Sequence, residues 1–195
     1  EMADFKNLLS DRTKLVAITH VSNALGTVVP LSEIIHYSHE AGSLVLVDGC
    51  QAVPHLAVDL QKLDADFYTF SGHKLYGPSG IGILYGKEEI LESMPPYQGG
   101  GEMIDTVSFK GSTWADLPFK FEAGTPNIAD AIGLGEAVNY VSSIGLDAIA
   151  AHESSLLSHA TERLNEMQSV KIIGNANNKA AIISFLIEGV HPHDI

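Results

Sequence analysis

Lys74 is the residue of this sequence best suited to covalent chemistry. It stands in Ser71-Gly72-His73-Lys74, where a hydroxyl, an imidazole and an amine follow a short aromatic run and precede several glycines. A lysine becomes nucleophilic when burial or a neighbouring positive charge lowers its pKa, and His73 and the aromatic residues would supply both. We interpret Lys74 as a Schiff-base lysine beside a phosphorylated cofactor. A solvated lysine in a surface turn is the alternative.

Asp48 is the second candidate. It follows the apolar residues 44–47, so we expect its carboxylate to be buried or nearly so and to need a partner. A protonated pyridine nitrogen would be a suitable partner, because the ion pair keeps the ring cationic and able to accept electrons. The alternative is an aspartate that caps the following turn.

Ser71 and His73 could donate hydrogen bonds to a phosphate, together with backbone N–H groups of the glycine-rich turn. Known nucleotide motifs are missing: there is no GxxxxGK[ST], and Gly80-Ile81-Gly82 lacks a third glycine. Gly133-Leu134-Gly135 falls inside a predicted helix. Nucleotide binding is therefore disfavoured.

No metal site is predicted. His36 and His39 lie three positions apart on a predicted helix, but no cysteine or carboxylate cluster joins them, so we interpret them as a solvated face. His191 and His193 near the end of the sequence give no stronger indication. Cys50, the only cysteine, is interpreted as a small packing residue rather than a reactive thiol.

The elements that must position these residues follow a wound α/β pattern. Apolar runs predict strands at 14–19, 44–47, 66–70 and 80–85, with a helix at 31–41. The first two runs are typical of strands buried on both faces. Strands that alternate with helices predict a mostly parallel sheet, in which ligands bind beyond the carboxyl ends of the strands.

Polar residues follow three of these strands at that end. Asn23 comes after the first strand, Asp48 and Gln51 after the second, and Ser71 to Lys74 after the third. This convergence supports a site at one edge of the sheet.

The rest of the chain is less regular. Residues 2–10 predict a weak helix or loop, and 94–127 is rich in Gly and Pro without periodicity, which suggests a functional or inter-subunit segment. Helices are predicted at 128–144, with an Asn127 cap and Gly145 after its end, and at 146–167. A buried strand is predicted at 181–187.

The composition limits the class of partner. The net charge of −13 arises from 11 Lys and Arg against 24 Asp and Glu, which argues against nucleic-acid binding. No apolar run is long enough for a membrane span. The absence of a leader and the single cysteine predict a cytoplasmic protein.

Four motifs resemble the SufS-type cysteine desulfurases of the class V aminotransferase family, which are fold type I pyridoxal phosphate (PLP) enzymes. They are Thr19-His20-Val21-Ser22-Asn23, Val47-Asp48-Gly49-Cys50-Gln51-Ala52, Ser71-Gly72-His73-Lys74-Leu75-Tyr76-Gly77-Pro78 and Glu122-Ala123-Gly124-Thr125-Pro126-Asn127. They occur in order and with family-like spacing.

The resemblance implies a role for each candidate. Lys74 would bind PLP as a Schiff base and move the substrate Cα proton, and Asp48 would pair with the pyridine nitrogen. Gln51 would contact the phenolic oxygen of the ring, and Ser71 and His73 would hold the phosphate.

Two further roles follow from the same resemblance. Asn23 would lie near the cofactor and the substrate carboxylate. Thr125 would reach the PLP of the partner subunit in a homodimer, which would explain the long irregular segment.

The implied fold is part of a large PLP-binding α/β domain at 1–127, including an inter-subunit loop at 94–127. A connecting helix at 128–145 and the beginning of a smaller α+β domain at 146–195 would follow. The family's aromatic residue stacked on the ring would lie before residue 1. Its persulfide-forming cysteine and substrate-binding arginine would lie beyond residue 195. We expect the chain to be a central piece that does not turn over substrate alone.

The implied reaction converts L-cysteine to L-alanine and an enzyme persulfide, which a sulfur-acceptor protein would receive for iron–sulfur cluster assembly. Selenocysteine lyase, kynureninase-like, aminotransferase and epimerase activities remain open within the family. Outside it, the alternatives are a non-catalytic α/β fragment that has lost the cofactor, or a PLP-free Schiff-base enzyme.

Overall fold

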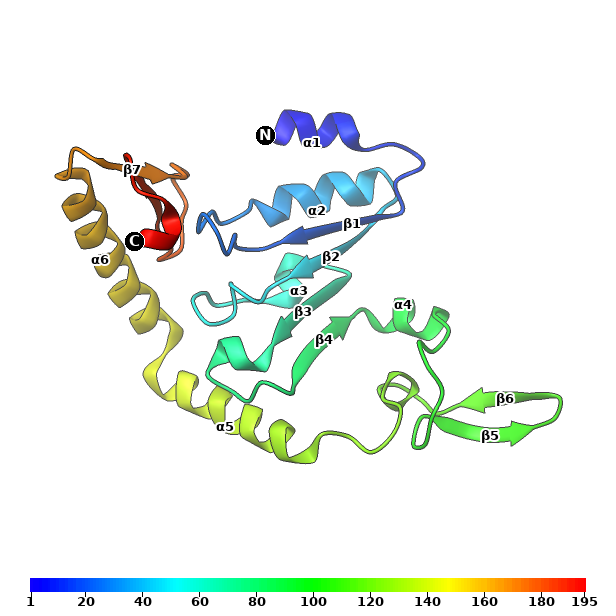
Figure 1. Cartoon of the computed structure of the whole chain (residues 1–195). Helices are drawn as coiled ribbons and strands as arrows, with labels where there is room; N and C mark the ends of the chain where they lie inside the picture. The colour runs from blue at the N-terminus through cyan, green and yellow to red at the C-terminus, as the bar shows by residue number, and fades with distance from the viewer.

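A four-stranded sheet lies at the centre of the chain. The computed structural model describes all of residues 1–195 (Figure 1). The strands are β1 (Leu15–Thr19), β2 (Leu44–Asp48), β3 (Phe67–Ser71) and β4 (Gly82–Gly86), in that order across the sheet. β1, β2 and β3 run parallel, and β4 runs antiparallel to β3. The predicted α/β fold with a mostly parallel sheet is confirmed.

Helix α2 (Leu31–Glu40) covers one face of this sheet and forms the main core. Its apolar residues recur three and four positions apart, so Leu31 and Ile35 lie on the same side of the helix. They pack with Val45 and Val47 of β2, whose side chains are completely buried. This packing fixes the position of β2, and of the turn that follows it, relative to α2.

The prediction that the first two strands are buried on both faces is wrong for this chain. Leu15 of β1 is 50% exposed and Leu44 of β2 is 37% exposed. β1 lies at an edge of the sheet, and α2 covers only the face that carries Val45 and Val47. Alternate side chains of a strand point to the opposite face, so Leu15 and Leu44 have no such cover.

The segment 94–127, predicted to lack regular structure, contains a hairpin. β5 (Ile104–Ser108) and β6 (Gly111–Trp114) pair antiparallel and extend away from the central sheet (Figure 1). The segment follows helix α4 (Glu88–Ser93). The buried Lys120 amine donates to the carbonyls of Leu91 and Glu92 at distances of 3.1 and 2.9 Å, which ties the segment back to the end of α4.

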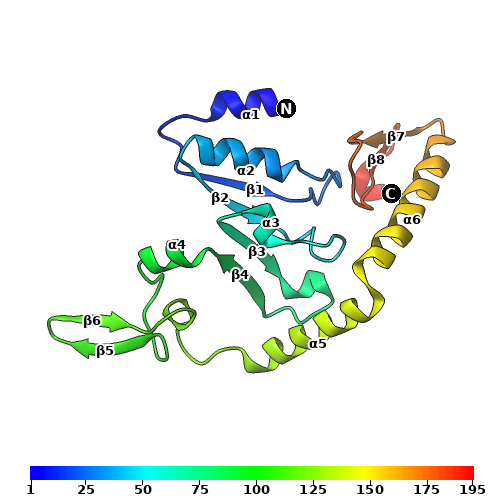
Figure 2. The ribbon, with the colours of Figure 1, turned by 180° about the vertical axis from the view of Figure 1, so that it is seen from behind.

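Two long helices form an arc around one side of the sheet (Figures 1 and 2). They are α5 (Ile128–Ile144) and α6 (Leu146–Asn165). As predicted, the Asn127 side chain caps α5 by accepting the Asp130 N–H, and Gly145 separates the two helices. Gly145 has a φ of 89°, which glycine adopts more readily than other residues.

A second hairpin follows α6. β7 (Val170–Ile173) pairs antiparallel with β8 (Ser184–Ile187), whereas the sequence predicted only one strand, at 181–187. The loop between them contacts the loop after β1: the Val28 N–H donates to the Asn178 carbonyl at 3.0 Å, and the Ala180 N–H donates to the Gly26 carbonyl at 2.8 Å. The predicted division of the chain into domains stays a prediction.

Five shorter elements complete the fold: α1 (Met2–Leu8), α3 (Leu60–Leu63) and the 3₁₀ helices η1 (Gly72–Leu75), η2 (Phe119–Phe121) and η3 (Pro192–Asp194). None of the helices combines the length and the apolar composition that a bilayer crossing requires.

Asp66 links several elements at the amino ends of the strands. Its buried carboxylate accepts the Val45 N–H at 2.7 Å and contacts His39 Nε2 at 2.8 Å and Lys87 Nζ at 2.9 Å. Burial alone would raise the pKa of Asp66, but hydrogen bonds from His39, Lys87 and the Val45 N–H together lower it. The carboxylate is therefore held ionised.

This cluster corrects the interpretation of the two α2 histidines as one solvated face. His36 is exposed and pairs only with Glu40, at 3.4 Å. His39 is half-buried against Asp66. The contact joins residues 27 positions apart, so the local helical spacing could not indicate it.

We expect Asp66→Asn to lower the free energy of unfolding by about 2–4 kcal/mol, because His39 and Lys87 lose their buried carboxylate partner and keep only the more exposed Asp64. The folded-state pKa of Asp66 lies below its ordinary 3.8, so the carboxylate stabilises fully above that value and its contribution disappears as the pH falls through the folded pKa. The wild-type protein should therefore lose more stability on acidification than the variant.

Urea unfolding at several pH values between about 7 and 3 measures this difference. The exposed Asp11, changed to Asn, is the matched control and should leave stability unchanged. Equal acid sensitivity of the wild type and Asp66→Asn would contradict the assignment.

Candidate functional site

The carboxyl ends of β1, β2 and β3 lie side by side. Thr19 of β1 stands in register with Asp48 of β2, which stands in register with Thr69 of β3. The ladder continues past the strands, because the His20 N–H donates to the Asp48 carbonyl and the Gly49 N–H to the Thr69 carbonyl, both at 2.8 Å. The polar residues after the three strands therefore emerge at one edge of the sheet.

Lys74 lies in the single 3₁₀ turn η1 that follows β3, and its side chain is half-buried. The turn is anchored from both sides. The Gly72 N–H donates to the Ile81 carbonyl at 2.8 Å, and the buried Leu75 packs in a cluster with Leu134 of α5. Helix α5 thus supports the turn from behind and holds Lys74 at the strand ends.

Tyr76 ends this turn in an unusual backbone conformation. Its φ of 59° places a bulky residue in the left-handed region, which favours glycine. The following Gly77 N–H closes the turn on the Gly72 carbonyl at 3.0 Å. The exposed Tyr76 ring meets Tyr140 of α5 edge-on. A strained residue two positions after Lys74 is typical of a backbone arranged for a site rather than for the core.

Asp48 is exposed in this chain, which corrects the prediction of a buried carboxylate. The physical reason is strand alternation: Val47 points into the core beneath α2, so Asp48 points to the other face. Its Oδ1 accepts the Cys50 N–H at 2.9 Å. The side chain therefore forms the turn cap that was considered as an alternative, with Oδ2 left without a hydrogen bond within the chain.

A pair that the sequence did not indicate supports this turn from below. Tyr68 is 2% exposed, and its hydroxyl lies 3.0 Å from His20 Nδ1. The ring passes so close to Gly49 that a Cβ at residue 49 would overlap it. Burial lowers the pKa of His20, so its imidazole stays neutral. Burial, with Asp48 and Cys50 nearby, raises the pKa of Tyr68, so its hydroxyl keeps its proton.

Cys50 and Ser71 bring the turns after β2 and β3 together. The Cys50 thiol lies 3.7 Å from Ser71 Oγ, and both side chains are half-buried. The thiol therefore fills the space between the two turns, as its interpretation as a packing residue predicts.

Several polar groups at this edge make no side-chain hydrogen bond within the chain: the Lys74 amine, the His73 ring, and the amides of Asn23 and Gln51. His73 and Asn23 are exposed, whereas Gln51 is half-buried. Together with Ser71 they provide donors for an anion. Asp48 provides one carboxylate for a cationic group. The arrangement suits a ligand that is anionic at one end and cationic at the other.

Thr125 is not brought to this edge within one chain. It is exposed, lies between the β5–β6 hairpin and α5 in the sequence, and lines a small pocket with Phe119, Glu122 and the Glu102 that precedes the hairpin. The other predicted site residues follow the three strand ends.

The aminotransferase class-V family profile matches residues 1–195. The chain belongs to this family. A cysteine desulfurase of Dickeya dadantii is 54% identical over 196 residues, which cover 100% of this chain and 47% of the relative. The curated relatives it matches are longer, and the chain spans 28% to 48% of their length.

Solved structures of class-V relatives share this architecture. The cysteine desulfurase CsdA of Escherichia coli, in its S-sulfonic acid form, has a TM-score of 0.94 and 39% identity, covering 100% of this chain and 48% of that one. A lysine-to-alanine variant of C-DES, with glycine covalently linked to its PLP cofactor, has a TM-score of 0.85 and 27% identity, covering 95% and 50%. A further C-DES structure contains the reaction product of this cystine C–S lyase, cysteine persulfide.

We expect Gly49→Ala to destabilise the protein by about 1–3 kcal/mol, because the new methyl group would force the Tyr68 ring out of its buried position and away from His20. Gly135→Ala is the matched control: a Cβ there would meet no atom within 4 Å, and a helical alanine should stabilise by about 0.5–1 kcal/mol. Thermal and urea unfolding compare the two variants. Equal stability of both would show that the Tyr68 packing does not constrain the turn.

Proposed function

We propose that the strand-end site binds PLP. The observation that carries this proposal is the convergence of Lys74, Asp48 and the Ser71–His73 donors at the ends of adjacent parallel strands. PLP has an anionic phosphate and a ring nitrogen that carries a proton, which matches the two ends of the donor set. The C-DES structure with a covalently linked PLP supports the same cofactor.

Each residue has a defined task in this proposal. Ser71 Oγ and His73 donate to the phosphate, at the start of η1. Asp48 accepts the ring N–H, and its hydrogen bond from the Cys50 N–H keeps the carboxylate in one orientation. Gln51 donates to the phenolic oxygen, and Asn23 contacts the substrate carboxylate.

When bound, PLP supplies an electron sink for negative charge that develops at the substrate Cα. Lys74 would hold the cofactor covalently in the resting protein, and its amine, once displaced by the substrate amine, would move the proton of the substrate Cα. The nearby Tyr68 hydroxyl and His20 imidazole are both neutral, so they add no competing charge beneath Asp48.

We further propose that the protein of which this chain forms part is a cysteine desulfurase that converts L-cysteine to L-alanine. Relatives near 50% identity that carry this name support it. The sulfur would pass to an enzyme cysteine outside this chain, since Cys50 lies between two turns of the cofactor site. We propose that the enzyme is of the SufS type and works in the cytoplasm. It would deliver the persulfide sulfur to an acceptor protein for iron–sulfur cluster assembly.

A second candidate is a C–S lyase acting on cystine, which the likeness to C-DES favours. The products distinguish the two reactions. A desulfurase leaves the carbon skeleton of cysteine as alanine, whereas a C–S lyase on cystine releases cysteine persulfide.

We expect the full-length protein to bind PLP and to show an absorption band at the edge of the visible range, which Lys74→Ala abolishes because the covalent bond to the cofactor cannot form. Lys62→Ala, which removes an exposed lysine of α3, is the control and should keep the band. Alanine release from L-cysteine should be lost in Lys74→Ala alone. A band that persists in Lys74→Ala would exclude this lysine as the attachment point.

We also propose that Thr125 completes the phosphate site of a partner subunit in a homodimer. Its exposure, in a pocket that none of the strand-end residues lines, supports this arrangement. The β5–β6 hairpin, which precedes it and projects from the sheet, would lie toward the partner (Figure 1).

Subunit mixing tests the shared site. Lys74→Ala and Thr125→Asp should each inactivate homodimers, the second because a carboxylate repels the phosphate. A heterodimer would then have one site with both defects and one intact site, so mixing equal amounts should restore roughly a quarter of the wild-type activity. Absence of recovery after verified subunit exchange would show that Thr125 acts within its own chain.

A further inference from the structure

His55 and Glu153 form a hydrogen-bonded contact between the turn after β2 and helix α6. His55 Nδ1 lies 2.8 and 2.9 Å from the two carboxylate oxygens of Glu153. The residues are 98 positions apart, and their side chains are 21% and 22% exposed. A contact to both oxygens at this depth restricts both partners far more than a surface ion pair would.

His55 belongs to the same turn as the proposed cofactor ligands. From Gly49 the chain forms a continuous series of turns, in which the Val53 N–H donates to the Gly49 carbonyl at 3.1 Å and the Leu56 N–H to the Ala52 carbonyl at 2.8 Å. Asp48 and Gln51 therefore stand on a short rigid segment, and His55 holds its far end.

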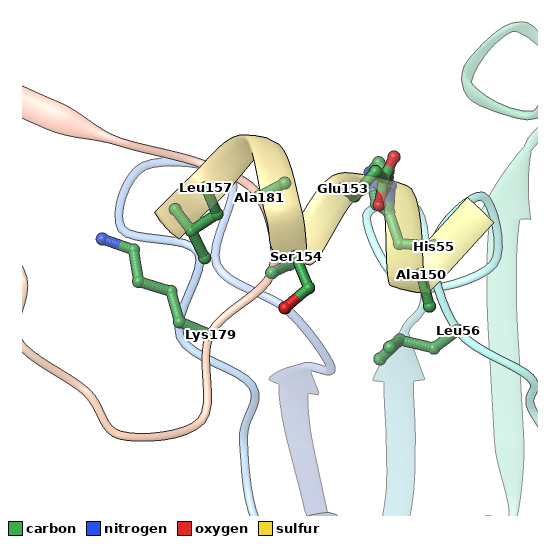
Figure 3. A pocket seen from close by; sticks show the side chains of 9 residues that line it. His55, Leu56, Ala150, Glu153, Ser154, Leu157, Lys179 and Ala181 are labelled. Carbon is green, nitrogen blue, oxygen red and sulfur yellow. Dashed lines mark hydrogen bonds and ion pairs between the residues drawn. The ribbon is translucent and has the colours of Figure 1, made fainter. Parts of the chain in front are cut away.

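Glu153 lies in the first half of α6, which passes beyond the carboxyl ends of the strands (Figures 1 and 3). Figure 3 shows His55 and Glu153 directed toward each other at one end of a small pocket between the helix and the sheet. Leu56 and Ala150 line the pocket beside them, and Lys179 lies at the other end. Leu146 and Ile149 at the start of α6 pack beside the Leu75–Leu134 cluster, and at Glu153 the His55 contact adds a hydrogen bond that aligns the helix with the turn after β2.

A separate set of contacts ties the next segment to the loop after β1. The Ala180 N–H donates to the Gly26 carbonyl at 2.8 Å, and Ser184 Oγ donates to the Ala24 carbonyl. The loop that carries Asn23 is therefore also held by the C-terminal part of the chain. The loops after β1 and β2 meet α6 and its hairpin at different points. Ala180 of the hairpin loop packs with Ala52 of the Asp48 turn, and the His55–Glu153 contact is the hydrogen bond that links this turn to α6.

We infer that His55 and Glu153 are positioning residues that fix the Asp48–Gln51 turn relative to helix α6. This inference rests on the proposed PLP site. Neither residue contacts the cofactor. Their role is to hold Asp48 and Gln51 where the ring nitrogen and phenolic oxygen of PLP would lie, so that the cofactor binds to a turn that is already ordered.

The test uses the full-length protein with the single variants His55→Ala and Glu153→Ala, and with both together. Hydrogen–deuterium exchange of the 49–56 peptide should increase about five- to tenfold in each single variant, because its amide hydrogen bonds open more often. The equilibrium dissociation constant for added PLP should rise by about the same factor. The double variant should be no worse than either single variant, because both remove one contact.

Two further variants separate positioning from general stability. Glu153→Gln keeps an oxygen that accepts the His55 Nδ1–H, so it should restore most of the PLP affinity and exchange protection. Glu162→Ala removes an exposed carboxylate from the same helix and should change neither quantity. Recovery with Gln but not with Ala identifies the hydrogen bond, rather than the fold of α6, as the cause.

The outcomes distinguish this inference from the proposed function. Unchanged exchange of the 49–56 peptide in His55→Ala and Glu153→Ala would overturn the positioning role, whatever the PLP affinity. Increased exchange in the two variants, together with a wild-type protein that binds no PLP, would overturn the cofactor proposal and leave the mechanical link intact. Increased exchange with unaltered PLP affinity would overturn the claim that the link serves the cofactor.

Discussion

The candidate site depends on the backbone hydrogen bonds that hold Asp48 and Gly49 between the two neighbouring strands. The Asp48 carbonyl accepts the His20 N–H and the next amide, that of Gly49, donates to the Thr69 carbonyl, so one residue is tied to both neighbouring strands. The sheet therefore fixes the main chain of Asp48 beyond the point where β2 ends. Only the Asp48 side chain is exposed to solvent, and its hydrogen bond from the Cys50 N–H restricts its orientation.

The Tyr68 ring determines how closely the backbone at Gly49 packs on the sheet. Gly49 permits the chain to pass directly over the ring, and the His20–Tyr68 contact keeps the ring in place. A neutral imidazole against a protonated phenol satisfies both polar groups without placing a charge in the core. The turn above can thus carry a charged carboxylate while the layer below remains electrically neutral.

The sequence predicted features that depend on residues close together in the chain. It missed side-chain contacts between residues that are far apart in the chain. Apolar runs located the strands, and the residues after them located the edge where Asp48 and Lys74 emerge. The Tyr68–His20, His39–Asp66 and His55–Glu153 contacts join residues 27 to 98 positions apart, and nothing in the local spacing indicates such pairs. Exposure of Asp48 was missed because an apolar run does not reveal which face of a strand a helix covers.

Charge explains why the donors must be local. The net charge of −13 would repel a phosphorylated ligand at long range, so its capture cannot depend on the overall field. At the strand ends the donors and the carboxylate stand on different strands. Lys74 and His73 follow β3, whereas Asp48 is the last residue of β2. In the proposed site, a ligand with a phosphate at one end and a protonated ring nitrogen at the other meets hydrogen-bond donors at the first end and the Asp48 carboxylate at the second in one orientation only. An inverted ligand would place its phosphate against Asp48, so the groups proposed to bind PLP would also determine its direction.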